Sequence, residues 1–210
     1  MMNERLTSSW SRCWAALGAA GSGDALMQRL IAAYAEPQRY YHTQQHLAEC
    51  LSLFDRYRSH AQEPGEVEMA LWFHDAIYDV FAADNEARSA DWAETALKQA
   101  GVDAQRVATI QRLILITRHD ALPTTADEAL LVDIDLAILG AERARFAEYE
   151  TQVRQEYAHV PEAAFRAGRA HILQGFLARQ PLYQTPALQR RLEPKAQQNL
   201  SHSLQQLALD

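Results

Sequence analysis

Histidine and aspartate residues recur in three short segments of this chain that are otherwise rich in apolar and aromatic residues. The segments are "YHTQQHL", "WFHDAIYDV" and "VDIDLAIL", which contain His42 and His46, His74 and Asp75, and Asp133 and Asp135. A carboxylate in apolar surroundings needs a partner, which could be a metal ion, an arginine or a helix end. Neutral imidazoles together with carboxylates suit a divalent metal such as manganese, iron, cobalt, nickel or zinc. The three segments therefore indicate a metal site if the fold brings them together.

Each of these pieces also has an ordinary interpretation. A histidine at the edge of a helix, such as His46, is more often a core or capping residue than a ligand. Asp135 could be a carboxylate on the flank of a helix, paired with an arginine such as Arg143. The order His, His-Asp, Asp on three separate helices, all near apolar faces, is much less expected by accident.

The elements that must position these residues are predicted to be helices throughout. Apolar residues recur at helical spacing, and turn or capping residues separate the runs. We expect helices over about residues 6–17, 24–36, 43–57, 66–77, 85–100, 103–117, 126–139, 141–157, 161–177 and 192–207. Adjacent His and Asp residues on a helix point about 100° apart, so both reach one ion only if it lies between helices. The core of an all-α bundle provides such a place.

Composition restricts the class of protein. A chain of 210 residues, nearly half of them apolar, is large enough for one sizeable core, so we expect a single domain. A net charge of −7 with only two lysines argues against binding to the nucleic acid backbone. Two distant cysteines, Cys13 and Cys50, fit a reducing cytoplasm. We see no signal peptide and no apolar run of roughly 20 residues, so we expect no membrane association.

The same segments carry a resemblance to a known family. The pieces "RYYHTQQHL", "LWFHDAIYD", "DNEARSA", "ITRH", "VDIDLAILG", "VRQEY", "FRAGRAHILQGFL" and "NLSHSL" extend from about residue 39 to 204. The chain resembles the HD superfamily of metal-dependent phosphohydrolases, whose signature is the order His, His-Asp, Asp. Within that superfamily it is similar to a group of predicted HD-superfamily phosphohydrolases. The resemblance implies one HD-like helical bundle over residues 1–210. Helices in residues 1–36 would pack on a metal-site core of about 39–140, and residues 141–210 would add the C-terminal helices.

The resemblance also implies a ligand set for one divalent metal ion, which could be Mn, Fe, Co, Ni, Zn or Mg. The implied ligands are His46, His74, Asp75 and Asp135. Asp135 is favoured over Asp133 because the last Asp of the superfamily is typically followed by an apolar stretch such as Leu136 to Leu139.

A second likeness concerns the proton donor. The piece "YHTQQH" is similar to the opening of cyclic-nucleotide phosphodiesterases, and this likeness implies that His42 protonates the leaving oxygen. Thr43 replaces the Asn of those enzymes, and Tyr78 lies near the place of a further His. One metal is therefore favoured over two.

The activity implied is hydrolysis of a small phosphorylated metabolite, with a nucleotide favoured, by attack of a metal-activated water on phosphorus. The candidate catalytic residues are His42, Asp79 and Glu86. The candidate substrate-binding residues are Arg118, His119, Arg154 and Arg169. Two alternatives remain open. One is a non-catalytic regulatory module that binds metal and nucleotide, and the other is a structural helical protein. Asp79 could simply cap a turn, and Arg169 could pair with Glu162.

Overall fold

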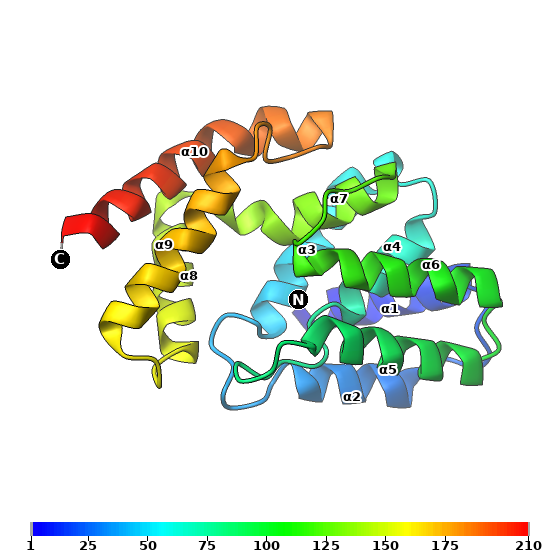
Figure 1. Cartoon of the computed structure of the whole chain (residues 1–210). Coiled ribbons are helices and arrows are strands. Elements are labelled where there is room, and N and C mark those ends of the chain that lie inside the picture. Colours follow the sequence, from blue (N-terminus) through cyan, green and yellow to red (C-terminus); the bar gives the residue numbers. More distant parts are fainter. Residues whose placement is uncertain (1, 210) are drawn as a thin grey trace. The chain divides into compact units, whose positions relative to one another are not determined.

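The structure is a computed structural model that describes residues 2–209. Over that range the chain forms ten α-helices and three short 3-10 helices and no strand, which confirms the predicted all-α class (Figure 1). The chain divides into two compact units, one up to Ile134 and one from Asp135 onward. Compact units need not be separate domains, so the single domain with its metal-site core ending near residue 140 stays a prediction.

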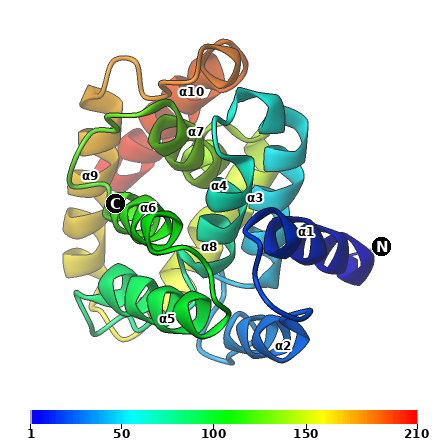
Figure 2. The same cartoon turned by 90° about the vertical axis from the view of Figure 1, so that its right-hand side faces the viewer.

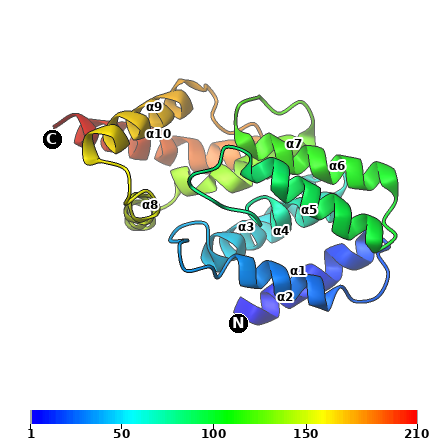
Figure 3. The ribbon, with the colours of Figure 1, turned by 60° about the horizontal axis from the view of Figure 1, so that its bottom comes forward.

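The first unit holds the helices that carry most candidate site residues. Its helices are α1 (Met2–Ala16), α2 (Asp24–Ala33), α3 (Gln44–Tyr57), η1 (Arg58–His60), α4 (Pro64–Phe73), α5 (Asn85–Gln99), α6 (Ala104–Leu115), η2 (Ile116–Arg118) and α7 (Ala126–Asp135), whose last residue begins the second unit. Helix α4 lies at the centre and contacts α1, α3, α5 and α6 (Figure 2). Helices α5 and α6 run side by side along the unit (Figure 3).

The central position of α4 follows from its sequence. The run "VEMALWF" has no polar stripe apart from one glutamate, and every residue from Gly65 to Phe73 is buried. A helix that is apolar nearly all round must be covered on all sides. Its buried Glu68 is compensated, because Ser9 Oγ donates to it at 2.6 Å and Arg12 Nε donates to it at 3.0 Å.

The end of α4 differs from the prediction. The sequence indicated a helix to Ile77, whereas the helix ends at Phe73 and His74 is its C-cap. The carbonyls of Asp75 and Ala76 accept hydrogen bonds from Arg39, a residue far away in the chain. The His-Asp pair therefore lies at the end of a helix and in the turn that follows it.

The second unit consists of η3 (Leu136–Gly140), α8 (Arg143–Glu156), α9 (Glu162–Ala178) and α10 (Pro186–Leu209). Helix η3 packs against α8 and α10, and α9 packs against α10. Side chains fix η3 in place: Asn199 Nδ2 donates to the carbonyl of Leu139 at 2.9 Å, and the Tyr183 hydroxyl donates to that of Leu136 at 3.0 Å. Among the helices within residues 2–209, none is both long and apolar enough to cross a bilayer.

Candidate metal centre

Two buried histidines face each other in the first unit. His46 lies in the first turn of α3, whose N-cap Thr43 accepts a hydrogen bond from the backbone N–H of Gln45. His74 follows the last residue of α4. Their Nε2 atoms are 3.0 Å apart, and both side chains are almost fully buried. Two imidazole nitrogens that approach this closely must share a proton or a cation.

The carboxylate of Asp75 joins the two imidazoles. Its Oδ2 atom lies 3.1 Å from His74 Nε2 and 3.4 Å from His46 Nε2. With the 3.0 Å separation of the nitrogens, the circle through the three atoms has a radius of about 1.8 Å, less than the roughly 2.0–2.2 Å of zinc bonds to nitrogen and oxygen. One point therefore lies at bonding distance from all three atoms. The donor set and its geometry fit a divalent metal ion.

The orientation of His74 is set by a backbone carbonyl. Its Nδ1 lies 2.8 Å from the carbonyl oxygen of Leu71 in the last turn of α4. A carbonyl can only accept, so Nδ1 carries a proton, and Nε2 is the ring nitrogen that a metal ion can bind. A hydrogen bond of this kind on the far nitrogen is usual for metal-ligating histidines.

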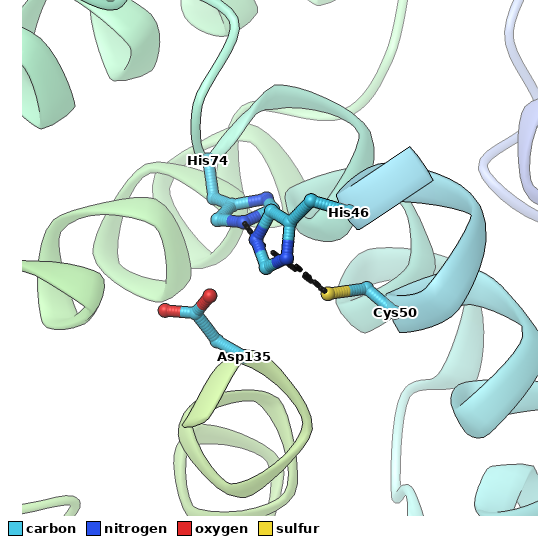
Figure 4. Close-up of side chains that lie close together, drawn as sticks. All are labelled: His46, Cys50, His74 and Asp135. Atoms are coloured by element: carbon cyan, nitrogen blue, oxygen red, sulfur yellow. Dashed lines mark hydrogen bonds between the residues drawn. The ribbon is translucent and has the colours of Figure 1, made fainter. Parts of the chain in front are cut away.

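Two further residues bring donor atoms to the same place. Ligand atoms of His46, Cys50, His74 and Asp135 all lie within 4.8 Å of one another, so these side chains could hold a metal ion (Figure 4). Asp135 is the last residue of α7 and the member of the Asp133/Asp135 pair that the family resemblance favours. These four residues and Asp75 are together called the metal-donor cluster below.

Cys50 was not among the predicted ligands. Its Sγ lies 3.7 Å from both ring nitrogens of His46, which places the sulfur beside the ring rather than nearest to Nε2. The signal that could have indicated this neighbour is the spacing of four residues, because residues i and i+4 share one face of a helix.

The environment keeps Asp75 ionised. Burial tends to raise the pKa of its carboxyl, but the charges of His74 and His42 and hydrogen bonds from His46 and His74 lower that pKa well below its usual range. The backbone N–H of Asp75 donates to the hydroxyl of Tyr34 at 3.2 Å. Burial raises the pKa of Tyr34 to about 12, so its hydroxyl stays neutral and can accept this bond.

His42, the predicted proton donor, lies beside the cluster. Its ring stacks on Tyr78, with the centroids 4.1 Å apart and the planes at 27°. The centroids of His42 and His46 are 6.0 Å apart. The structure thus brings His42 close to one of the predicted ligands, on the loop that precedes α3.

The two predicted carboxylate catalysts lie at and just before the start of α5. Asp79 is exposed, and its Oδ1 accepts a hydrogen bond from the backbone N–H of Phe81 at 2.9 Å. Its own backbone N–H donates to Asn85 Oδ1, so Asp79 caps the turn before α5. Glu86 lies in the first turn of α5, where a carboxylate favours the helix dipole. Catalytic roles for these two residues stay predictions.

The residues predicted to bind phosphate fall in both units. In the first, Arg118 forms an exposed ion pair with Asp120 at 3.0 Å. His119 follows η2 with a φ of 58°, in the left-handed region.

In the second unit, Arg154 Nε donates to Glu162 at 3.0 Å and its Nη1 donates to the carbonyl of Tyr157 at 2.7 Å. Arg169 is buried over the ring of Tyr149 and lies 3.9 Å from Glu150, rather than beside Glu162 as the alternative supposed. Phosphate binding by these residues stays a prediction.

Comparison with known proteins gave no relatives. No protein-family model matches the chain, and no match was found among curated proteins or among solved structures.

Proposed function

We propose that this chain belongs to the HD superfamily and is a metal-dependent phosphohydrolase. The observation that carries the proposal is the convergence of His46 Nε2, His74 Nε2 and Asp75 Oδ2 on one point at metal-bonding distance. These residues come from the first two parts of the order His, His-Asp, Asp, and Asp135 from the third part completes the set. The ion proposed is a single divalent metal, from among Mn, Fe, Co, Ni, Zn and Mg.

His74, Asp75 and His42 would have different roles at such a site. A bound divalent ion supplies Lewis acidity toward a phosphoryl oxygen and lowers the pKa of water. The hydrogen bond to the carbonyl of Leu71 orients the His74 ring so that its Nε2 would bind the ion, and the lowered pKa keeps Asp75 anionic. His42 would give a proton from its ring to the leaving oxygen, and the proximity of its ring to that of His46 supports this role.

The substrate proposed is a small phosphorylated metabolite, with a nucleotide favoured. Arg118 is the proposed phosphate contact with the most accessible guanidinium, since half of its side chain is exposed and its partner Asp120 is exposed as well. An arginine fork can bind two phosphate oxygens at once.

A second candidate is a regulatory module that holds a metal and a nucleotide without turnover. The capping role of Asp79 favours it, because the carboxylate that follows the His-Asp pair most closely is already engaged in a turn.

The test is release of inorganic phosphate from a panel of nucleotides and sugar phosphates, with manganese, cobalt, magnesium or zinc supplied in turn. Wild type, Asp75→Ala and the matched control Asp91→Ala, which changes an exposed residue of α5, are assayed together. We expect metal-dependent release by wild type and the control, and none by Asp75→Ala. Equal release by Asp75→Ala would refute the hydrolase, and binding of a nucleotide without release would favour the module.

A further inference from the structure

A buried arginine outside the metal-donor cluster joins the two chain segments that carry His42 and Asp75. The side chain of Arg39 is completely buried. Its Nη1 donates to the carbonyl of His42 at 3.1 Å and to that of Asp75 at 2.6 Å, and its Nη2 donates to the carbonyl of Ala76 at 3.0 Å. One guanidinium thus binds the loop before α3 and the turn after α4.

The burial of this cation is compensated on every side. Its Nε donates to the Glu36 carboxylate at 3.1 Å, and its guanidinium carbon lies 5.3 Å and 5.5 Å from the ring centroids of Tyr34 and Tyr78. A buried charge is tolerated only when it is paired and hydrogen-bonded, as here. The side chain offers no exposed surface to a substrate, so its role cannot be direct contact with one.

The bonds of Arg39 replace those that a continuing helix would have made. Backbone carbonyls that are buried outside a helix need partners from elsewhere. Those of Asp75 and Ala76 find theirs in Arg39, so the chain turns directly after His74 and the Asp75 carboxylate faces the imidazoles. The bond to the His42 carbonyl holds the other segment, on which the His42 ring stacks against Tyr78.

We propose that Arg39 is a positioning residue that fixes His42 and Asp75 relative to each other. Its planar fork reaches three carbonyls in two segments, which the single ammonium of lysine cannot reproduce. The catalytic consequence rests on the proposed function, whereas the positioning itself does not. The proposal therefore needs one readout that requires neither metal nor substrate.

The first readout is the NMR signal of the His42 ring in the metal-free full-length protein. Because the His42 and Tyr78 rings stack with their centroids 4.1 Å apart, we expect the Tyr78 ring to shield the His42 ring protons in wild type. We expect Arg39→Ala and Arg39→Lys to lose this upfield shift, and added guanidinium to restore it in Arg39→Ala. Arg12→Lys is the control, because Arg12 also forms ion pairs, but its hydrogen bonds go to Glu68 and Asp55, which lie outside the two segments.

The outcomes separate positioning from general stability. An unchanged His42 shift in folded Arg39→Lys, or an equal change in Arg12→Lys, would overturn the proposal. Arg39→Lys keeps the charge, so it serves if Arg39→Ala does not fold.

The second readout is the affinity for manganese or zinc. We expect about a 10- to 100-fold loss in Arg39→Lys, the range found when residues that support metal ligands are removed. Unchanged affinity in Arg39→Lys would show that Arg39 does not position Asp75 for metal binding. A wild type that binds none of the six candidate ions would refute the proposed metal-dependent function, while the His42 signal would still decide the role of Arg39.

Discussion

Asp75→Asn is expected to remove most of the stability that a bound divalent ion gives to the folded protein. The replacement keeps the size of the side chain but exchanges an anionic oxygen for a neutral amide. That oxygen lies 3.1 Å and 3.4 Å from the two histidine nitrogens with which it forms the three-atom site. Loss of its charge weakens the attraction for a divalent cation while the surrounding packing stays the same.

The size of the effect follows from linkage between binding and folding. An ion present at about 100 times its dissociation constant adds about 2.7 kcal/mol to the free energy of unfolding if it binds only the native state. For a chain of 210 residues each kcal/mol raises the melting temperature by about 2–4 °C. Wild type should therefore gain about 5–11 °C. If Asp75→Asn weakens the affinity for the ion by about 100-fold, the same ion concentration adds only about 0.4 kcal/mol to the free energy of unfolding, or about 1–2 °C to the melting temperature.

The assay is thermal unfolding followed by far-ultraviolet circular dichroism, first with a chelator and then with zinc or manganese. The quantity compared is the rise caused by the ion, so any change in the metal-free protein cancels. Asp91→Asn, an exposed position on α5, is the matched control and should keep the full rise. An equal rise in Asp75→Asn and wild type would show that the ion binds elsewhere, and the three-atom site would be wrong.

Two further predictions concern stability without metal. Gly140→Ala should lower the free energy of unfolding by about 1–3 kcal/mol, because the new Cβ would lie 2.7 Å from Leu192 Cβ. Gly168→Ala in α9 meets no neighbouring atom and should raise the free energy of unfolding by about 0.5–1 kcal/mol. Chemical denaturation of both variants measures these changes, and changes of the same sign would contradict the prediction. Burial tends to raise the pKa of Glu128, but hydrogen bonds from Thr124 and other neighbours lower it. The ionised carboxylate therefore stabilises the fold above the ordinary value of 4.5 and loses that effect as the pH falls through the lower folded pKa. Glu128→Gln should be less stable than wild type near neutral pH, with the difference shrinking on acidification; a difference independent of pH would refute the assignment.

Helical periodicity was sufficient to predict the class of fold and the buried face of α3. Leu47, Cys50 and Phe54 follow one another at helical spacing, and all are buried. Local pattern could not predict the end of α4, because no glycine or proline stops it there. The residue that binds the carbonyls beyond its end is Arg39, 36 and 37 positions away in the chain. Such a contact exists only once the tertiary structure has formed.

The candidate site, too, could be predicted from the sequence only in part. The sequence indicated His46, His74 and Asp75 by residue type and order, and the structure brings them together. Cys50 was missed although its spacing from His46 was visible, because a cysteine on an apolar face is ordinarily a small core residue. Arg39 offered no signal beyond its charge, since what distinguishes it is burial.

The end of α4 also explains how neighbouring residues can serve one ion. On a continuing helix His74 and Asp75 would point about 100° apart. The chain instead leaves the helix between them, so that their side-chain atoms lie 3.1 Å from each other. This turn places an anion, Asp75, and a cation, Arg39, in the same buried region, where the guanidinium binds the backbone carbonyl of the residue whose carboxylate faces the histidines. The burial of the carboxylate itself is offset by the charges of His74 and His42 and by hydrogen bonds from His46 and His74, whereas the arginine stabilises the turn that brings this carboxylate to the histidines.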